Sequence, residues 1–150
     1  MERIPIRFLT PESFSKYGRI LEPMPKEKAN AKSETFAFYV LERAVSEGWR
    51  MAYWIISHRS CEELEEHPNS KETFEPIKGV AILIVAPHDD ANSVEAFLLD
   101  KPVIINEGVW HGDLSLSNEV HMRINENLDV QSGTHKLPFK IKAELYLERV

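Results

Sequence analysis

Short apolar and aromatic runs recur along the chain, and their patterns are those of β-strands. Residues 80–87, VAILIVAP, are apolar throughout and predict a strand that is buried on both faces. Residues 50–57, RMAYWIIS, are aromatic and β-branched, which also favours a strand. Residues 140–148, KIKAELYLE, alternate polar and apolar side chains, as expected of a strand with one buried face. The patterning therefore indicates a chain built mainly of β-structure.

Shorter runs predict further strands at residues 4–8, 103–105, 114–116 and 120–124, and from residue 139 to 147. Pro5 cannot donate to a strand ladder, so the first of these strands is expected at a sheet edge. With nine prolines and little helical pattern, the sequence predicts an all-β sandwich or barrel. No repeat or linker divides the chain, so we expect residues 1–150 to form a single domain.

A few segments favour other structure. Thr10 followed by Pro11 predicts the start of a short helix, and Gly18 is placed to end it. The segment 35–41 fits a strand, although 33–47 also fits a helical period. The remaining predictions are an exposed loop at residues 22–32 and a helix or long turn at residues 91–99.

Charge and cysteine content narrow the class of protein. The formal net charge is −6 and no basic stripe is present, which argues against a nucleic-acid-binding surface. Cys61 is the only cysteine, so no intramolecular disulfide can form, as is common in cytoplasmic proteins. The first residues do not resemble a signal peptide, and no apolar run is long enough to span a membrane. We therefore expect a cytoplasmic protein with no membrane association.

The stretch 63–79, ELEEHPNSKETFEPIKG, holds the most informative side chains. Glu65 and His67 are two residues apart, so a strand directs both to the same face. A turn through residues 68–70 would bring Glu72 beside them on the next strand. The acidic run around Glu65 could instead be a solvated face, which is the more common role of such runs.

This spacing resembles the first motif of the cupins, a superfamily of small β-barrels, with Glu65 in place of the first histidine. Gly108 and His111 match the end of the second cupin motif. The resemblance implies a cupin-type double-stranded β-helix, or jelly-roll, barrel with one or two short helices. It also implies a divalent metal held by Glu65, His67, Glu72 and His111. Two imidazoles and two carboxylates suit Mn, Fe, Ni or Zn.

Several segments resemble one cupin family, the ureidoglycolate lyases. They are residues 9–21 (LTPESFSKYGRIL), residues 63–79, the strand VAILIVAP and the step GVWH at residues 108–111. The resemblance implies cleavage of ureidoglycolate, a small carboxylate, to glyoxylate and urea, and it implies a homodimer. Such cleavage needs a base, an acid and a positive centre for the carboxylate.

The resemblance also suggests roles for individual side chains. His111 or Glu72 is expected to ligate the metal, or to act as the base if no metal is bound. Arg59 aligns with an arginine of the family and is the first candidate for binding the substrate carboxylate, with Lys78 as the second. Arg59 could equally pair with a carboxylate of the acidic run. Trp110 is expected in the core or the pocket wall.

The sequence also departs from the family pattern around the expected pocket. Where the family has Asn-Tyr-His-Arg before Gly-Val-Trp-His, this chain has Ile-Ile-Asn-Glu at residues 104–107. Gly112 and Asp113 stand where the family has His and Pro, and Glu72 replaces a Gln. Two alternatives therefore stay open beside the lyase: another cupin enzyme, such as a sugar isomerase or epimerase, and a non-catalytic small-ligand-binding module.

Overall fold

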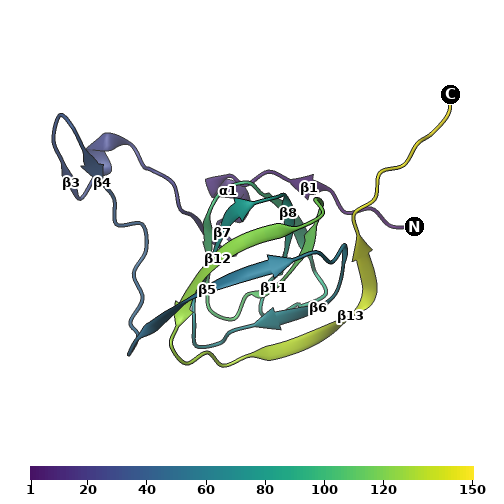
Figure 1. Ribbon diagram of the computed structural model, residues 1–150. Helices are drawn as coiled ribbons and strands as arrows, with labels where there is room; N and C mark the ends of the chain where they lie inside the picture. Colours follow the sequence, from purple (N-terminus) through teal and green to yellow (C-terminus); the bar gives the residue numbers. More distant parts are fainter.

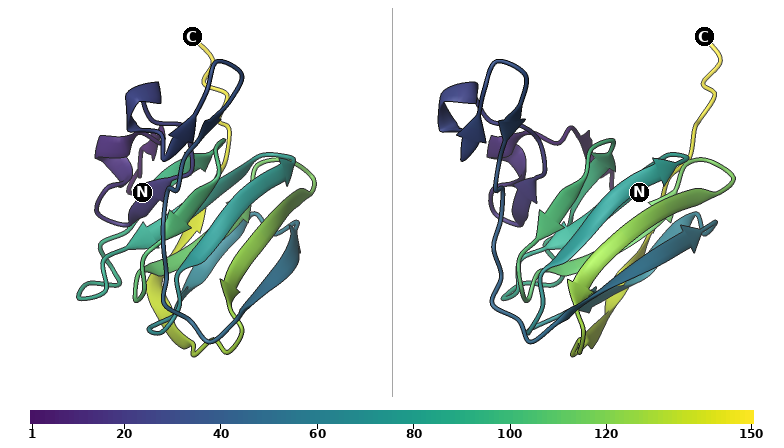
Figure 2. Two further views of the ribbon diagram at one scale, coloured as in Figure 1. Left: turned by 90° about the vertical axis from the view of Figure 1, so that its left-hand side faces the viewer. Right: turned by 60° about the vertical axis from the view of Figure 1, so that its left-hand side comes forward.

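The computed structural model describes residues 1–150, and its body consists of two β-sheets that face each other (Figures 1 and 2). The first sheet has six strands, in the spatial order β1 (Ile6–Arg7), β9 (Glu95–Leu99), β8 (Ala81–Ala86), β11 (Trp110–Ser115), β6 (Ser60–Glu66) and β13 (Gly133–Lys142). The second has five, in the order β2 (Gly18–Ile20), β10 (Val103–Ile105), β7 (Glu72–Lys78), β12 (Val120–Asn127) and β5 (Trp49–Ile56).

The remaining elements are small. A two-stranded hairpin of β3 (Ala31–Lys32) and β4 (Ala37–Phe38) projects from the barrel (Figure 2). The helices are α1 (Pro11–Phe14) and the 3₁₀ helix η1 (Lys26–Lys28). No helix in the structure is both long enough and apolar enough to cross a bilayer.

The chain passes back and forth between the two sheets. Strands β5, β6, β7 and β8 lie alternately in the second and first sheets, and β10 to β13 alternate in the same way. Every pairing is antiparallel except that of β1 with β9. This winding confirms the predicted all-β, cupin-type barrel with one short α-helix.

Strand β8 lies at the centre of the packing. Leu83 and Val85 belong to the cluster between the sheets, together with Phe74 of β7. Ile82 and Ile84, on the opposite face of β8, pack into a second cluster on the outside of the first sheet. All six residues of β8 are buried, which confirms the strand predicted from its uninterrupted apolar run.

The N-terminal prediction is confirmed at the start of the helix and wrong at its end. Thr10 caps α1: its hydroxyl accepts from the amide of Ser13, and the Ser13 hydroxyl accepts from the amide of Thr10, each at 3.0 Å. The helix ends at Phe14, well before Gly18. Gly18 instead begins β2, where a Cβ atom would overlap the backbone carbonyl of Ile104 on β10. The close approach of two strands, not a helix end, requires this glycine.

Three other segments differ from their predictions. The helix or turn expected at residues 91–99 is wrong, because β9 (Glu95–Leu99) is inserted between β8 and β1 and pairs with both. Residues 35–41 form neither the long strand nor the helix: only β4 is regular, and Phe36 and Phe38 are exposed. The last strand begins at Gly133, earlier than expected, and ends at Lys142.

Candidate functional site

A cavity of about 650 Å³ opens between the two sheets. Its walls come from β5, β7 and β12 on one side and from β6, β11 and β13 on the other. Arg50 is the only lysine or arginine that lines it, whereas six acidic residues do: Glu62, Glu63, Glu65, Glu72, Asp113 and Glu126. Because like charges repel in such a confined space, an anionic ligand would need an additional positive centre here.

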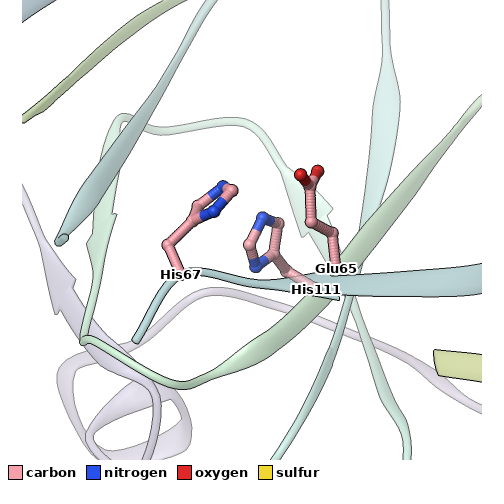
Figure 3. A group of neighbouring side chains, drawn as sticks. All are labelled: Glu65, His67 and His111. Atoms are coloured by element: carbon pink, nitrogen blue, oxygen red, sulfur yellow. The ribbon is translucent and has the colours of Figure 1, made fainter. Parts of the chain in front are cut away.

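The two sequence motifs meet at the inner end of this cavity. His111 of β11 pairs in register with Glu65 of β6, and His67 follows directly after β6. The Nε2 atoms of His67 and His111 lie 3.1 and 3.0 Å from the same oxygen, Oε2 of Glu72. Figure 3 shows the two rings side by side with the Glu65 carboxylate beside them. The structure therefore brings together all four side chains that the sequence nominated as metal ligands.

Each imidazole is held by its other nitrogen. The Nδ1–H group of His67 donates to the carbonyl of Gln131 at 3.2 Å, and Ser132 Oγ lies 3.0 Å from the same nitrogen. The Nδ1–H group of His111 donates to the carbonyl of Val109 at 3.0 Å. A carbonyl only accepts, so these partners assign the proton of each ring to Nδ1. The second nitrogen of each ring, Nε2, is thereby directed at Glu72, as in histidines that ligate metals.

The Glu72 oxygen between the two rings has no hydrogen bond. Glu72 Oε2 is fully buried and within ion-pair distance of both Nε2 atoms, but neither contact has hydrogen-bond geometry. A buried carboxylate oxygen without a partner is costly, so the arrangement calls for protons on the rings or a cation between them.

The donor atoms are spaced closely enough for a cation. Those of Glu65, His67 and His111 lie within 4.8 Å of one another, and so do those of His67, Glu72 and Glu126. Ligand atoms at about 2.0–2.2 Å from one ion lie up to about 4.4 Å apart. Small movements of these side chains would therefore bring their donor atoms within ligating distance of one ion. The buried histidine and glutamate cluster can thus hold a divalent cation.

Without a cation, the cluster shares protons. Burial alone would raise the pKa of Glu72, but the His111 and His67 imidazoles outweigh it and lower that pKa to about 2. Burial alone would lower the pKa values of His67 and His111, but the Glu72 carboxylate outweighs it and raises both. The cluster therefore holds an ionised carboxylate between two protonatable rings. A bound metal ion would supply the positive charge that the ring protons supply in its absence.

Two further cavity residues were missed by the sequence reasoning. Glu126 of β12 has a side chain only 8% exposed, and its carboxylate pairs with Arg50 of β5 at 3.1 Å. A period-two pattern could have found it, since Val120, Met122 and Ile124 on the same strand all face the core. Glu126 continues that inward row and ends it with a carboxylate.

Comparison with known proteins identifies the family. The family model described as ureidoglycolate lyase matches residues 1–132. The chain belongs to the ureidoglycolate lyase family. The ureidoglycolate lyase of Rhizobium leguminosarum bv. trifolii (strain WSM2304) is 26% identical over an alignment of 133 residues, and the match covers 79% of this chain and 80% of that protein. The ureidoglycolate lyase of Agrobacterium fabrum (strain C58 / ATCC 33970) is 28% identical over an alignment of 120 residues, and the match covers 71% of this chain and 72% of that protein.

A solved structure of a dTDP sugar isomerase from Desulfovibrio desulfuricans G20 is also similar to the chain. It is 12% identical, has a TM-score of 0.42, and the match covers 75% of this chain and 78% of that one.

In this ureidoglycolate lyase family member, the side chains expected to bind substrate lie away from the cavity. The Arg59 guanidinium donates to the carbonyl of Leu116 at 2.8 Å and to Asn118 Oδ1 at 3.4 Å. Lys78 is exposed at the end of β7, and Trp110 packs against the outer cluster, with Nε1–H donating to a loop carbonyl. None of the three lines the cavity.

A second set of hydrogen-bonded side chains in the cavity lining consists of His58, Trp54 and Asp113. The Nε2–H group of His58 donates to Asp113 Oδ1 at 2.8 Å, and the Trp54 indole donates to Asp113 Oδ2 at 3.0 Å. Asp113 is one of the positions at which the sequence departs from the family pattern, and the structure shows that it anchors His58. Cys61 lies nearby, and burial raises the pKa of its thiol to about 11, which keeps it protonated and unreactive at neutral pH.

Proposed function

We propose that the protein is a metal-dependent lyase that cleaves ureidoglycolate, or a closely related small α-hydroxy acid, and that it works as a homodimer. Family membership supports a lyase in general terms. The observation that carries the metal dependence is the unpaired Glu72 oxygen between the Nε2 atoms of His67 and His111. In a cavity lined by carboxylates, a cation would also let an anionic substrate bind.

The proposed ligands are Glu65, His67, Glu72 and His111, and the proposed metal is Mn, Fe, Ni or Zn, which accept mixed imidazole and carboxylate ligands. When bound, the metal would polarise the substrate hydroxyl and neutralise the substrate carboxylate. Arg50 takes the anchoring role that the sequence assigned to Arg59, because its guanidinium lines the cavity and suits two-point binding of a carboxylate.

Two other groups of the lining suit the proton transfers. Glu126 lies beside His67 and Glu72 and is the carboxylate in position to take the proton of the substrate hydroxyl. His58, held by Asp113, is in the same cavity and is the candidate to protonate the departing ureido nitrogen. As the hydroxyl proton leaves, its O–H electron pair forms the carbonyl of glyoxylate, the C–N bond breaks, and the protonated ureido nitrogen departs as urea.

Urea release from ureidoglycolate tests this proposal. Purified protein should contain about one divalent metal per chain, release urea, and lose both properties after treatment with a chelator. Glu72→Gln should lose the metal and the activity, whereas Glu66→Gln, a neighbour on β6 that pairs with His88 and does not line the cavity, should keep both. Metal-free protein with full activity would contradict the metal, and metal-loaded protein that releases no urea would contradict the substrate.

A further inference from the structure

The C-terminal tail, residues 143–150, has the pattern of a strand but no strand to pair with. The apolar positions at every second residue of β13 continue into it as Ala143, Leu145 and Leu147. No backbone pairing involves these residues, and the tail leaves the barrel (Figures 1 and 2). Leu145 and Leu147 are 102% and 96% exposed. An apolar row that is buried at its start is thus left in solvent at its end.

The start of this row shows which face of the tail is meant to be covered. Ile141 and Ala143 pack against the cluster on the outside of the first sheet. Leu145 and Leu147 follow at intervals of two, so an extended tail presents them on the same side. The opposite side carries Glu144, Tyr146 and Glu148. The tail is therefore amphipathic in the manner of a strand with one buried face.

An unprotected strand edge of matching character lies on the second sheet. Strand β5 (Trp49–Ile56) pairs with β12 on one side and with no strand on the other. Its outward-facing residues, Trp49, Met51, Tyr53 and Ile55, are 51–69% exposed. Edge strands are usually guarded by proline, lysine, bulges or shortness, and β5 has eight residues with neither proline nor lysine.

We propose that the tail of one copy adds as a strand to the free edge of β5 in a second copy, and that the exchange is reciprocal. Strand addition would pair backbone N–H and C=O groups of the tail with those that β5 leaves free along its edge. The apolar row of the tail would lie beside the exposed row of β5. A two-fold exchange satisfies both edges at once, as closed dimers require.

The tail cannot occupy β5 of its own copy. Lys142, the last residue of β13, pairs with Ser60 at the start of β6, so the tail continues past that end of the strand pair. To return to its own β5 it would need a turn, and residues 143–150 contain no Gly, Pro, Asn or Asp. The family model ends at residue 132, so the tail lies outside the region that this chain shares with it.

The mass of the protein in solution tests the proposal, which rests on the homodimer of the proposed function and not on the lyase activity, so urea release can succeed or fail independently of it. By light scattering, the full chain should have twice the mass of one 17.3 kDa chain. Leu145→Glu/Leu147→Glu should be monomeric, whereas the matched control Glu144→Gln/Glu148→Gln, on the other face of the tail, should stay dimeric. A monomeric full chain, or a dimer that survives the leucine changes, overturns the proposal.

The acceptor edge needs its own variants. Met51→Glu places a charge in the exposed row of β5 and should give a monomer, whereas Ile77→Glu, at a 49% exposed position on the interior strand β7, should not. Unchanged circular dichroism and melting temperature would show that each variant is folded. A Met51→Glu protein that is folded and dimeric overturns the assignment to β5.

Mixing two monomeric variants distinguishes tail exchange from other interfaces. Met51→Glu keeps an intact tail, and Leu145→Glu/Leu147→Glu keeps an intact β5 edge. In the mixture, the intact tail of Met51→Glu can therefore pair with the intact β5 edge of Leu145→Glu/Leu147→Glu. Two copies of the same variant cannot form this pairing. The mixture should associate at concentrations at which each variant alone is monomeric, and a mixture that stays monomeric throughout rules out the exchange.

Discussion

Histidines meet carboxylates in two different settings in this protein. In the cavity, the Nε2 atoms of His67 and His111 lie 3.1 and 3.0 Å from Glu72 Oε2, and all three side chains are at most 8% exposed. On the surface, His88 meets Glu66 at 2.7 Å with a side chain 68% exposed. The chemical groups and distances are alike, so the difference between the two settings is the water around them.

Burial decides what each contact can do. The Nδ1–H group of His88 donates to both Glu66 and the carbonyl of Gly108, whose φ of 74° is the left-handed turn before β11. Such exposed pairs contribute little to the free energy of unfolding, because water solvates either partner well when the other is absent. In the cavity no water replaces a lost partner, so the cluster must keep its charges balanced, by protons or by a metal.

Removing His111 should have the largest effect. In metal-free protein, His111→Ala takes one imidazole from a buried carboxylate and should lower the free energy of unfolding by about 3–5 kcal/mol. Glu72→Gln combined with His111→Ala should cost less than the sum of the two single changes, because the stranded charge is gone. Urea denaturation measures this coupling, and additive costs would show that the carboxylate does not depend on the ring.

Acid should remove the contribution of Glu72. Its folded pKa of about 2 lies below the unfolded value, so the stability it provides is present above about pH 4.3 and is lost as the pH falls towards 2. The loss should reach about 3 kcal/mol in denaturation curves compared with Glu72→Gln. Glu66→Gln is the control, and its pH profile should follow that of the unmodified protein.

The two imidazoles should act in the opposite direction. Their folded pKa values are raised, so their contribution is complete below the ordinary histidine pKa of about 6.5 and is lost as the pH rises through the raised values. Metal-free protein should thus be most stable between about pH 4.5 and 6.5. A stability that keeps rising up to pH 8 without metal would contradict the cluster as described.

Adding metal should stabilise the protein through the cavity cluster alone. At a metal concentration of 100 Kd the gain should be about 2.7 kcal/mol, and it should grow with pH because the metal competes with imidazole protons. Thermal unfolding with and without Mn, Fe, Ni or Zn measures it. The gain should vanish in His67→Ala and persist in His88→Ala, and equal gains in the two variants would place the metal elsewhere.

Changing the surface pair should have the smallest effect. His88→Ala should leave the free energy of unfolding nearly unchanged, and high salt should shrink any change further. Metal content and urea release should stay as in the unmodified protein. A loss of metal in this variant would remove the distinction drawn between the buried and the exposed contacts.

Local patterns in the sequence predicted the structural features that depend only on residues close together in the chain. The apolar run of β8, the Thr10 cap of α1 and the all-β class all follow from local patterns and are confirmed. The proximity of Glu65, His67 and Glu72 also follows from local sequence, because one strand, a turn and the next strand bring the three side chains together. His111 was found through resemblance to a motif, and the structure places it opposite Glu65.

Which distant segments share a wall depends on the tertiary structure. Arg50 lies in β5 and Arg59 soon after it, yet only Arg50 lines the cavity, and Glu126 joins Arg50 from a strand more than 70 residues away. The alternating pattern of residues 140–148 likewise does not show that its pairing with β6 ends at Lys142. A residue pattern fixes the face that a side chain takes on its own strand, but the neighbour across the sheet or the cavity depends on how the whole chain is wound.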